Sequence, residues 1–166
     1  SDKAHLENLK AIRAERFELM AQLERLPNDL VFYTQITMEA AEDPEFLKAM
    51  RRAKIRGALV GIESVTPEGL KAVYKDFNMA GEALVTRLQA FGHHGVHVLG
   101  SFIFGLPTDK PDTFKATADL AQRAGVAFAQ FILLQPFPGT VAFAMWEKEE
   151  SAAALGGSTP VSRYWL

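Results

Sequence analysis

The sequence contains no cysteine among its 166 residues. Disulfides, thiolate nucleophiles and cysteine-ligated zinc or iron–sulfur sites are therefore excluded within this chain. It also lacks a run of about 18 apolar residues, so no transmembrane helix is expected. Neither sign of charge dominates, since 18 Lys and Arg face 20 Asp and Glu. That balance argues against broad binding to nucleic acid or to an anionic membrane.

The composition that remains is typical of a globular domain. Hydrophobic residues make up 48% of the chain and charged residues 23%, both ordinary values for such a domain. We expect one domain over residues 1–150, followed by a flexible or extended segment over 151–166, which is rich in small residues. The first residues are charged and form no signal-peptide core, so the expected location is cytoplasmic.

Apolar and turn-forming residues alternate along the chain in a pattern typical of an α/β fold. Short apolar runs predict strands over residues 30–36, 58–62, 96–104 and 128–134. Helical periodicity predicts helices over residues 3–26, 44–54, 80–91, 111–124 and 141–150. Asp43-Pro44 and Thr66-Pro67 each combine an N-cap with a first-turn proline. Four continuously apolar strands separated by helices predict a parallel sheet, buried on both faces, as in part of a (β/α) barrel.

Polar and backbone-exposing residues follow these strands where each one ends, and in parallel α/β folds that edge carries the site. Glu63 and Ser64 follow the second strand, and Gly105 follows the third. Gln135 and Pro136 follow the fourth. Each has a structural alternative: Glu63 could pair with an arginine or cap a helix, and Gly105 could serve a turn.

Other chemistry-bearing residues favour structural roles. His93 and His94 fall at a helix end, beside the opposite edge of the sheet, where a cation suits the helix dipole. Asp43, Asp109 and Asp112 are interpreted as helix-start residues. A run of basic residues is interpreted as a solvated face: Lys48, Arg51, Arg52, Lys54 and Arg56. No P-loop, Gly-x-Gly-x-x-Gly or Gly-x-Ser-x-Gly motif is present, and we assign neither a catalytic residue nor a metal ligand to this chain.

Several segments, taken together, resemble radical S-adenosylmethionine (SAM) enzymes. They are Asp43-Pro44-Glu45-Phe46-Leu47-Lys48-Ala49-Met50, Val60-Gly61-Ile62-Glu63-Ser64, Leu70-Lys71, Gly100-Ser101-Phe102-Ile103-Phe104-Gly105-Leu106-Pro107 and Gln135-Pro136-Phe137-Pro138-Gly139-Thr140. Their order and spacing are most similar to the subgroup whose members often carry a cobalamin-binding domain. The resemblance covers roughly residues 28–150.

The resemblance implies a partial (β/α) barrel in which a 4Fe–4S cluster reductively cleaves SAM to a 5′-deoxyadenosyl radical. By motif, Glu63 and Ser64 correspond to the strand end that contacts the ribose hydroxyls. Ile103 and Gly105 correspond to the segment that contacts adenine, and Gln135 and Pro136 to the strand exit near adenine and substrate. The cofactors implied for the full-length parent are SAM, the cluster and, in members that carry it, cobalamin.

The chain departs from the family in lacking the Cys-x3-Cys-x2-Cys cluster loop and the first two family strands. We therefore expect the carboxyl-terminal half of such a core, inactive alone and belonging to a parent that is an enzyme. Its expected partners are the missing half of the barrel, an unidentified small-molecule substrate and, through exposed strand edges, further copies of itself. The alternative is a cysteine-free binding or assembly module with the same fold.

Overall fold

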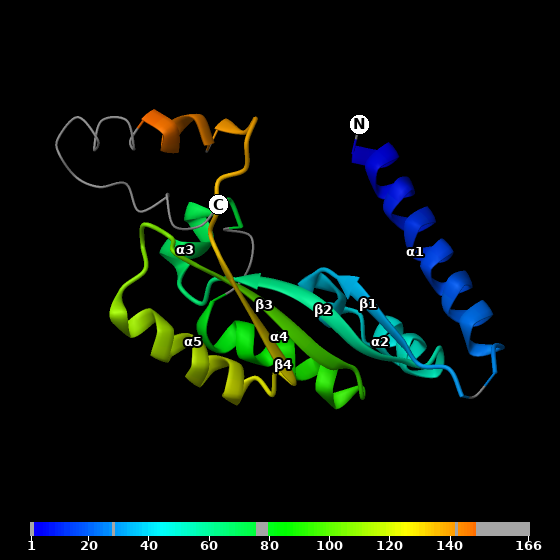
Figure 1. Ribbon diagram of the computed structural model, residues 1–166. Coiled ribbons are helices and arrows are strands. Elements are labelled where there is room, and N and C mark those ends of the chain that lie inside the picture. Colours follow the sequence, from blue (N-terminus) through cyan, green and yellow to red (C-terminus); the bar gives the residue numbers. More distant parts are fainter. Residues whose placement is uncertain (1, 28, 76–79, 142, 149–166) are drawn as a thin grey trace. The chain divides into compact units, whose positions relative to one another are not determined.

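The computed structural model describes residues 2–27, 29–75, 80–141 and 143–148. The chain divides into two compact units, residues 1–133 and 134–166 (Figure 1). The segment expected over residues 151–166 lies outside the described residues, and the expected domain boundary at residue 150 stays a prediction. In the second unit, residues 143–148 are helical, and Thr140 Oγ1 accepts a hydrogen bond from Phe143 N at 3.1 Å.

The first unit is built on one four-stranded sheet whose strands are all parallel. In the sheet the strands follow their chain order, β1-β2-β3-β4. The strands are β1 (Phe32–Ile36), β2 (Ile55–Glu63), β3 (His97–Phe104) and β4 (Phe128–Leu133). This confirms the predicted fold class of four parallel strands alternating with helices.

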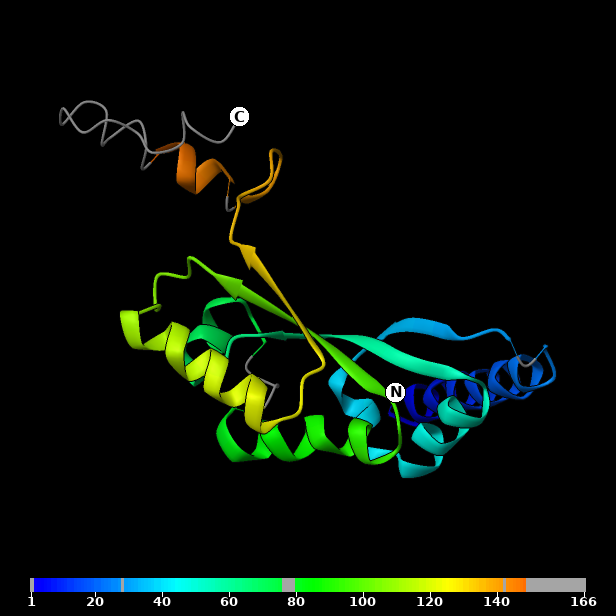
Figure 2. The ribbon, with the colours of Figure 1, turned by 60° about the horizontal axis from the view of Figure 1, so that its bottom comes forward.

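The helices of the first unit lie on one side of the sheet, the lower side in Figure 2, and all of them except α1 connect one strand to the next. They are α1 (Asp2–Glu24), η1 (Met38–Glu42), α2 (Pro44–Arg52), α3 (Pro67–Ala72), α4 (Gly81–His93) and α5 (Pro111–Arg123). The short 3-10 helix η1 was not predicted from the sequence. No helix of the described residues is long and apolar enough to cross a membrane.

The predicted N-caps begin α2 and α3. The Asp43 carboxylate accepts a hydrogen bond from Phe46 N at 3.0 Å, and Thr66 Oγ1 accepts one from Gly69 N at 3.1 Å. A proline stands at the first turn of each helix. Because such a cap satisfies an otherwise unpaired backbone donor, each contributes about 1 kcal/mol to helix stability.

The hydrophobic core lies between the sheet and the helices. Ala58, Val60 and Ile62 of β2 are completely buried, and Phe102 of β3 is buried beside them. They belong to one cluster with helix residues such as Leu47, Leu84, Leu88 and Phe91. Since side chains alternate along a strand, the residues between them point to the opposite face.

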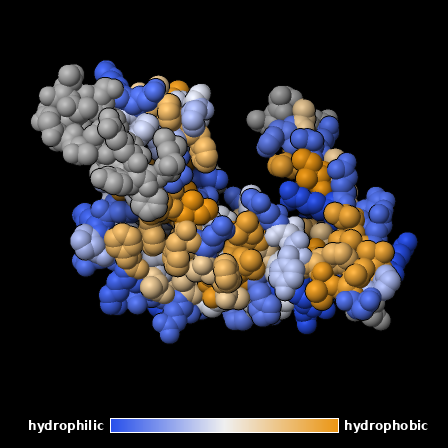
Figure 3. Space-filling view, viewed as in Figure 1, coloured by the Kyte–Doolittle hydropathy of each residue, from blue (hydrophilic) through white to orange (hydrophobic). Residues whose placement is uncertain are grey.

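That opposite face, which we call the open face, is covered by no helix among the described residues of the first unit. A row of paired residues crosses it, one from each strand: Gln35, Leu59, Leu99 and Phe128. Phe128 and Ile132 of β4 are 61% and 45% exposed, and hydrophobic side chains gather over the strands in Figure 3. The expectation of strands buried on both faces is therefore wrong for β4, and for β1, whose residues alternate between half-buried and exposed.

The interpretation of the basic run as a solvated face is wrong at Lys54. Its side chain is 8% exposed, whereas Lys48, Arg51 and Arg52 are exposed. Lys54 Nζ donates to three backbone carbonyls, that of Glu24 at the end of α1 at 3.4 Å and those of Leu26 and, at 3.0 Å, Pro27 just beyond it. A buried ammonium needs such partners, and here it ties the end of α1 to the start of β2.

We expect the substitution Lys54→Met to lower the free energy of unfolding by about 1–3 kcal/mol, because it removes the hydrogen bonds of a buried ammonium to three backbone carbonyls. The control is Lys48→Met, which removes only an exposed ion pair with Glu45 and should cost less than about 1 kcal/mol. Urea unfolding followed by circular dichroism measures both. Equal, small losses would contradict the structural role of Lys54.

We propose that the isolated chain self-associates through the outer strands of the sheet, because among the described residues of the first unit β1 and β4 each pair on one edge only. Light scattering at micromolar concentration should give a mass above the monomer's 18.3 kDa. Ile132→Lys, which places a charge on the outer strand β4, should restore the monomer. Leu19→Lys, an equal change at an exposed position of α1, should not. A wild-type monomer at that concentration would contradict the proposal.

Candidate functional site

The candidate site lies where β2 and β3 end, at the edge of the sheet that parallel α/β proteins use for binding. β2 ends at Glu63, and the chain leaves β3 through Gly105. Of the residues predicted for the site, Glu63, Ser64, Ile103 and Gly105 belong to the first unit. Their surroundings differ, and only some of these side chains are free to contact a ligand.

Glu63 has the most unusual backbone of the four. Its φ is +67°, in the left-handed region that residues with a side chain rarely enter. The register between β2 and β3 shifts just before it, between Gly61 and Glu63. The carboxylate folds back over Gly61, since a Cβ at that glycine would lie 2.6 Å from Glu63 Oε1. Because Gly61 pairs with Ser101 on the open face, the carboxylate lies on that face.

The Glu63 carboxylate makes no hydrogen bond or ion pair within the part of the chain that the structure describes. Neither structural alternative, an arginine partner or a helix cap, is therefore observed among those residues. Backbone strain and an unpaired charge each cost free energy, and proteins concentrate both at functional sites. Glu63 is thus a carboxylate free to accept hydrogen bonds from a ligand.

Ser64 is oriented differently. Its side chain is 4% exposed, and its Oγ accepts a hydrogen bond from Thr66 N at 3.3 Å and lies 3.3 Å from Thr66 Oγ1. A Cβ at Gly69 would lie 2.1 Å from the same Oγ. Ser64 therefore supports the start of α3, and its contact with a ribose hydroxyl stays a prediction.

Ile103 and Gly105 lie at the end of β3. Ile103 pairs with Ile132 of β4 and is half-buried on the open face. Gly105 has a φ of +88°, a conformation that favours glycine. Its N–H and that of Leu106 donate to Asp109 Oδ2 at 2.8 and 3.0 Å, so the backbone of this loop is fixed.

The helix-start role expected for Asp109 is wrong. α5 begins later, at Pro111, and Lys110 N donates to Thr113 Oγ1 at 3.0 Å. Asp109 instead holds the loop after β3, a role that the sequence analysis missed. The signal was available, because an aspartate a few residues after a strand-end glycine commonly accepts backbone N–H groups of its own loop.

Gln135 and Pro136 belong to the second unit. Gln135 is exposed and Pro136 half-buried. Their proximity to adenine and substrate stays a prediction.

The histidines have the structural surroundings expected of them. α4 ends at His93, and His94 Nδ1 lies 2.8 Å from the carbonyl oxygen of Ala90. Across the described ranges, no group of three or more His, Asp and Glu side chains could hold a metal ion. An iron–sulfur cluster does not fit this chain's own residues, which include no cysteine. SAM does fit, because the free Glu63 carboxylate on an apolar face can accept hydrogen bonds from its hydroxyls.

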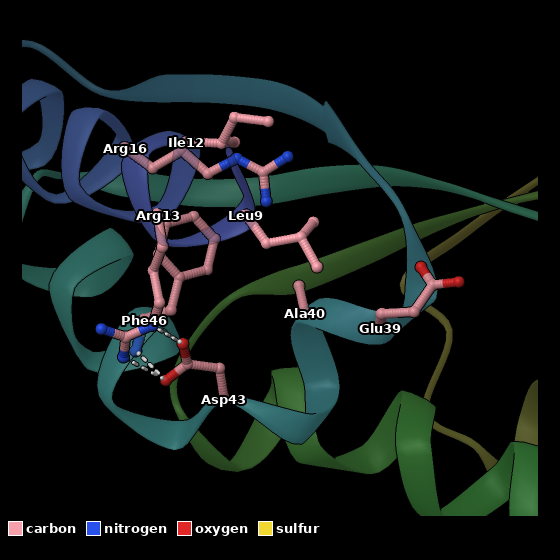
Figure 4. A pocket seen from close by; sticks show the side chains of 8 residues that line it. All are labelled: Leu9, Ile12, Arg13, Arg16, Glu39, Ala40, Asp43 and Phe46. Carbon is pink, nitrogen blue, oxygen red and sulfur yellow. Dashed lines mark hydrogen bonds and ion pairs between the residues drawn. The ribbon is translucent and has the colours of Figure 1, made fainter. Parts of the chain in front are cut away.

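A pocket of about 240 Å³ lies elsewhere, between α1 and the segment that carries η1 and the start of α2 (Figure 4). Arg13 crosses from α1 to Asp43, with Nε 2.9 Å from Oδ2. The hydrogen bond from Arg13 is the main reason why the pKa of the Asp43 carboxyl lies below its usual value. The pocket is separated from the candidate site, because α1 and α2 pack on each other and its lining includes no residue of β2 or β3.

No family model matches the chain. Two curated relatives are methyl-transferring enzymes. The hopanoid C-2 methylase of Rhodopseudomonas palustris (strain TIE-1) is 29% identical over 153 residues, which are 90% of this chain and 28% of the methylase. The bacteriochlorophyllide d C-12(1)-methyltransferase of Chlorobaculum tepidum is 34% identical over 110 residues, 65% of this chain and 24% of that enzyme. The chain thus spans about a quarter of the length of the curated relatives it matches.

Solved structures share the fold. The radical SAM methyltransferase TsrM of Kitasatospora setae, with cobalamin and a 4Fe–4S cluster bound, superposes with a TM-score of 0.65 at 20% identity. The match covers 81% of this chain and 28% of TsrM. The cobalamin-dependent radical SAM enzyme OxsB gives a TM-score of 0.55 at 14% identity, over 80% of this chain and 19% of OxsB. The chain therefore shares the fold of part of two enzymes of the subgroup that its sequence resembles.

We expect Asp43→Ala to lower the free energy of unfolding by about 1 kcal/mol through loss of the N-cap. Asp43→Asn should cost less, because asparagine keeps the cap and loses only the charge that faces Arg13. Since the folded-state pKa of Asp43 is lowered, its charge stabilises the fold above the unfolded-state pKa of about 3.9. That contribution disappears as the pH falls through the folded-state pKa.

The melting temperatures of wild type and Asp43→Asn should therefore converge on acidification from neutral pH to about pH 3. Thermal denaturation across that range measures the difference. A constant difference, or Asn as damaging as Ala, would show that the Arg13–Asp43 pair does not stabilise the fold.

Proposed function

We propose that this chain holds the ribose and adenine end of SAM within a radical SAM enzyme, and that it is inactive alone. The observation that carries the proposal is the unpartnered Glu63 carboxylate on the open face, at the end of a buried strand. The curated relatives transfer methyl groups, so methyl transfer is the reaction class that we propose for the whole enzyme. We also propose that the enzyme is cytoplasmic.

Glu63 would act by accepting hydrogen bonds from the two ribose hydroxyls. A carboxylate accepts such bonds in pairs, and charged acceptors make them stronger than neutral ones. Ile103 supplies a flat apolar contact suited to adenine. Gly105, whose loop is fixed by Asp109, lets the backbone approach the base closely.

The cluster ligands would have to come from residues outside this chain, because it has no cysteine. When bound, the cluster supplies the electron for reductive cleavage of SAM. What this chain's own residues do is bind and orient the nucleoside end of SAM and present an apolar face that limits water around it. Cobalamin, which the TsrM and OxsB structures contain, belongs to the same proposal, and no residue here is assigned to it.

The open face and the outer edge of β1 would be completed by further strands of the barrel. Four parallel strands cannot close on themselves, whereas a barrel of about eight strands has an interior that side chains can fill. The aromatic ring of Tyr33 on β1 is 66% exposed, and an added strand would cover it. Half of the SAM site is therefore expected to lie on the completing strands.

We expect the isolated chain to bind SAM only weakly, with a dissociation constant in the millimolar range. Glu63→Gln should weaken this binding about tenfold, because a charged hydrogen-bond acceptor is lost. The matched control is Glu68→Gln, the same change at an exposed position of α3, which should leave the affinity unchanged. Chemical-shift changes in nitrogen-15-labelled protein during a SAM titration measure all three affinities.

Calorimetric binding in the micromolar range would contradict the account of an incomplete site. Equal affinities of wild type and Glu63→Gln would contradict the role of Glu63. In that case the alternative, a cysteine-free binding or assembly module, would be favoured.

A further inference from the structure

The left-handed backbone of Glu63 is held by a tight turn at the end of β2. A left-handed backbone is strained for a residue with a side chain. Ser64 N donates to Ile62 O at 2.9 Å and closes a tight turn around Glu63. The carboxylate of Glu63 lies back over Gly61 of β2, two residues before it.

The space into which the carboxylate folds exists only because residue 61 has no side chain. A Cβ there would lie 2.6 Å from Glu63 Oε1, closer than real Cβ contacts come, and 3.5 Å from its Cδ. Apart from the chain neighbours of Gly61, no other atom of the described residues lies within 4 Å of that position. The Glu63 carboxylate therefore occupies the space that a side chain at residue 61 would fill.

We propose that Gly61 is a positioning residue, whose missing side chain lets the Glu63 carboxylate lie over β2 on the open face. That the carboxylate then binds the hydroxyls of a nucleoside rests on the proposed function; its placement by Gly61 does not. Gly61 touches no ligand in this account and acts through Glu63.

The effect of a methyl group at this position can be anticipated from what surrounds it. The atom in its way is the far end of a flexible side chain rather than backbone. Glu63 can therefore swing away while the strand stays in place, so Gly61→Ala should fold but present its carboxylate elsewhere. The loss should appear in ligand binding rather than in stability.

Gly57 offers a matched control in the same strand. It pairs with His97 on the open face, as Gly61 does with Ser101. A Cβ at Gly57 would meet the ring of Tyr33, with Cδ1 and Cε1 both at 2.7 Å, and would lie 3.3 Å from the carbonyl oxygen of His97. Gly57→Ala thus makes the same chemical change with an equally close contact, but it leaves Glu63 untouched. Gly92→Ala, where nothing lies within 4 Å, controls for folding.

The first experiment measures the placement itself by nuclear magnetic resonance of the 166-residue chain. Wild type should show nuclear Overhauser effects between the Glu63 side chain and the Gly61 Hα protons. They should be absent between Glu63 and residue 61 in Gly61→Ala and retained in Gly57→Ala, with a dispersed spectrum in both variants. Absence of these effects in wild type, or their retention in Gly61→Ala, would overturn the proposal whether or not SAM binds.

The second experiment is a double-mutant cycle in which SAM is titrated into wild type, Gly61→Ala, Glu63→Gln and the double variant. Gly61→Ala should weaken binding about tenfold, as Glu63→Gln does, and the double variant should be no weaker than either single variant. Such non-additivity is the signature of two residues that act through one group. Independent, multiplying losses would overturn the positioning role. Equal affinity of wild type and Glu63→Gln would instead refute the proposed function and leave the first experiment to decide the placement.

Discussion

The rest of the structure depends on the one-sided covering of a parallel sheet. Neighbouring parallel strands need a crossover connection, and crossovers are almost always right-handed. When successive strands lie side by side in chain order, as β1 to β4 do, every such crossover puts its helix on the same face. The core therefore forms between sheet and helices, and the other face stays open for something that is not a helix of this unit.

The open face explains why a strained, unpaired carboxylate can persist at the end of β2. A carboxylate on the helix side would lie in the core, where an unpaired charge is very costly. On the open face it remains half-exposed and keeps its capacity to accept hydrogen bonds. The same edge carries the loop after β3, whose two backbone N–H groups are satisfied by Asp109. The edge therefore combines a loop with a fixed backbone and a carboxylate that can accept hydrogen bonds from a ligand.

Much of the fold could be predicted from local sequence, because local interactions determine it. The caps at Asp43 and Thr66 need only residues three positions away, and the apolar run before Glu63 is sufficient to identify β2. The burial of Lys54 could not be predicted, since its carbonyl partners lie 27 to 30 residues away in the sequence. Nor could the exposure of β4, because an apolar strand has the same composition whether or not its second face is covered. At the candidate site the residue type of Glu63 was informative, whereas its left-handed backbone and the space above Gly61 depend on the register between two strands.

The central claim is that the open face beside Glu63 holds the nucleoside end of SAM. The most direct measurement is the set of intermolecular nuclear Overhauser effects between SAM and the protein at saturating ligand. The account predicts contacts from the ribose protons to the Hα protons of Gly61 and from the adenine protons to the Ile103 methyl groups. Contacts confined to Leu9 and Ile12 would contradict it and place the ligand in the pocket beside α1.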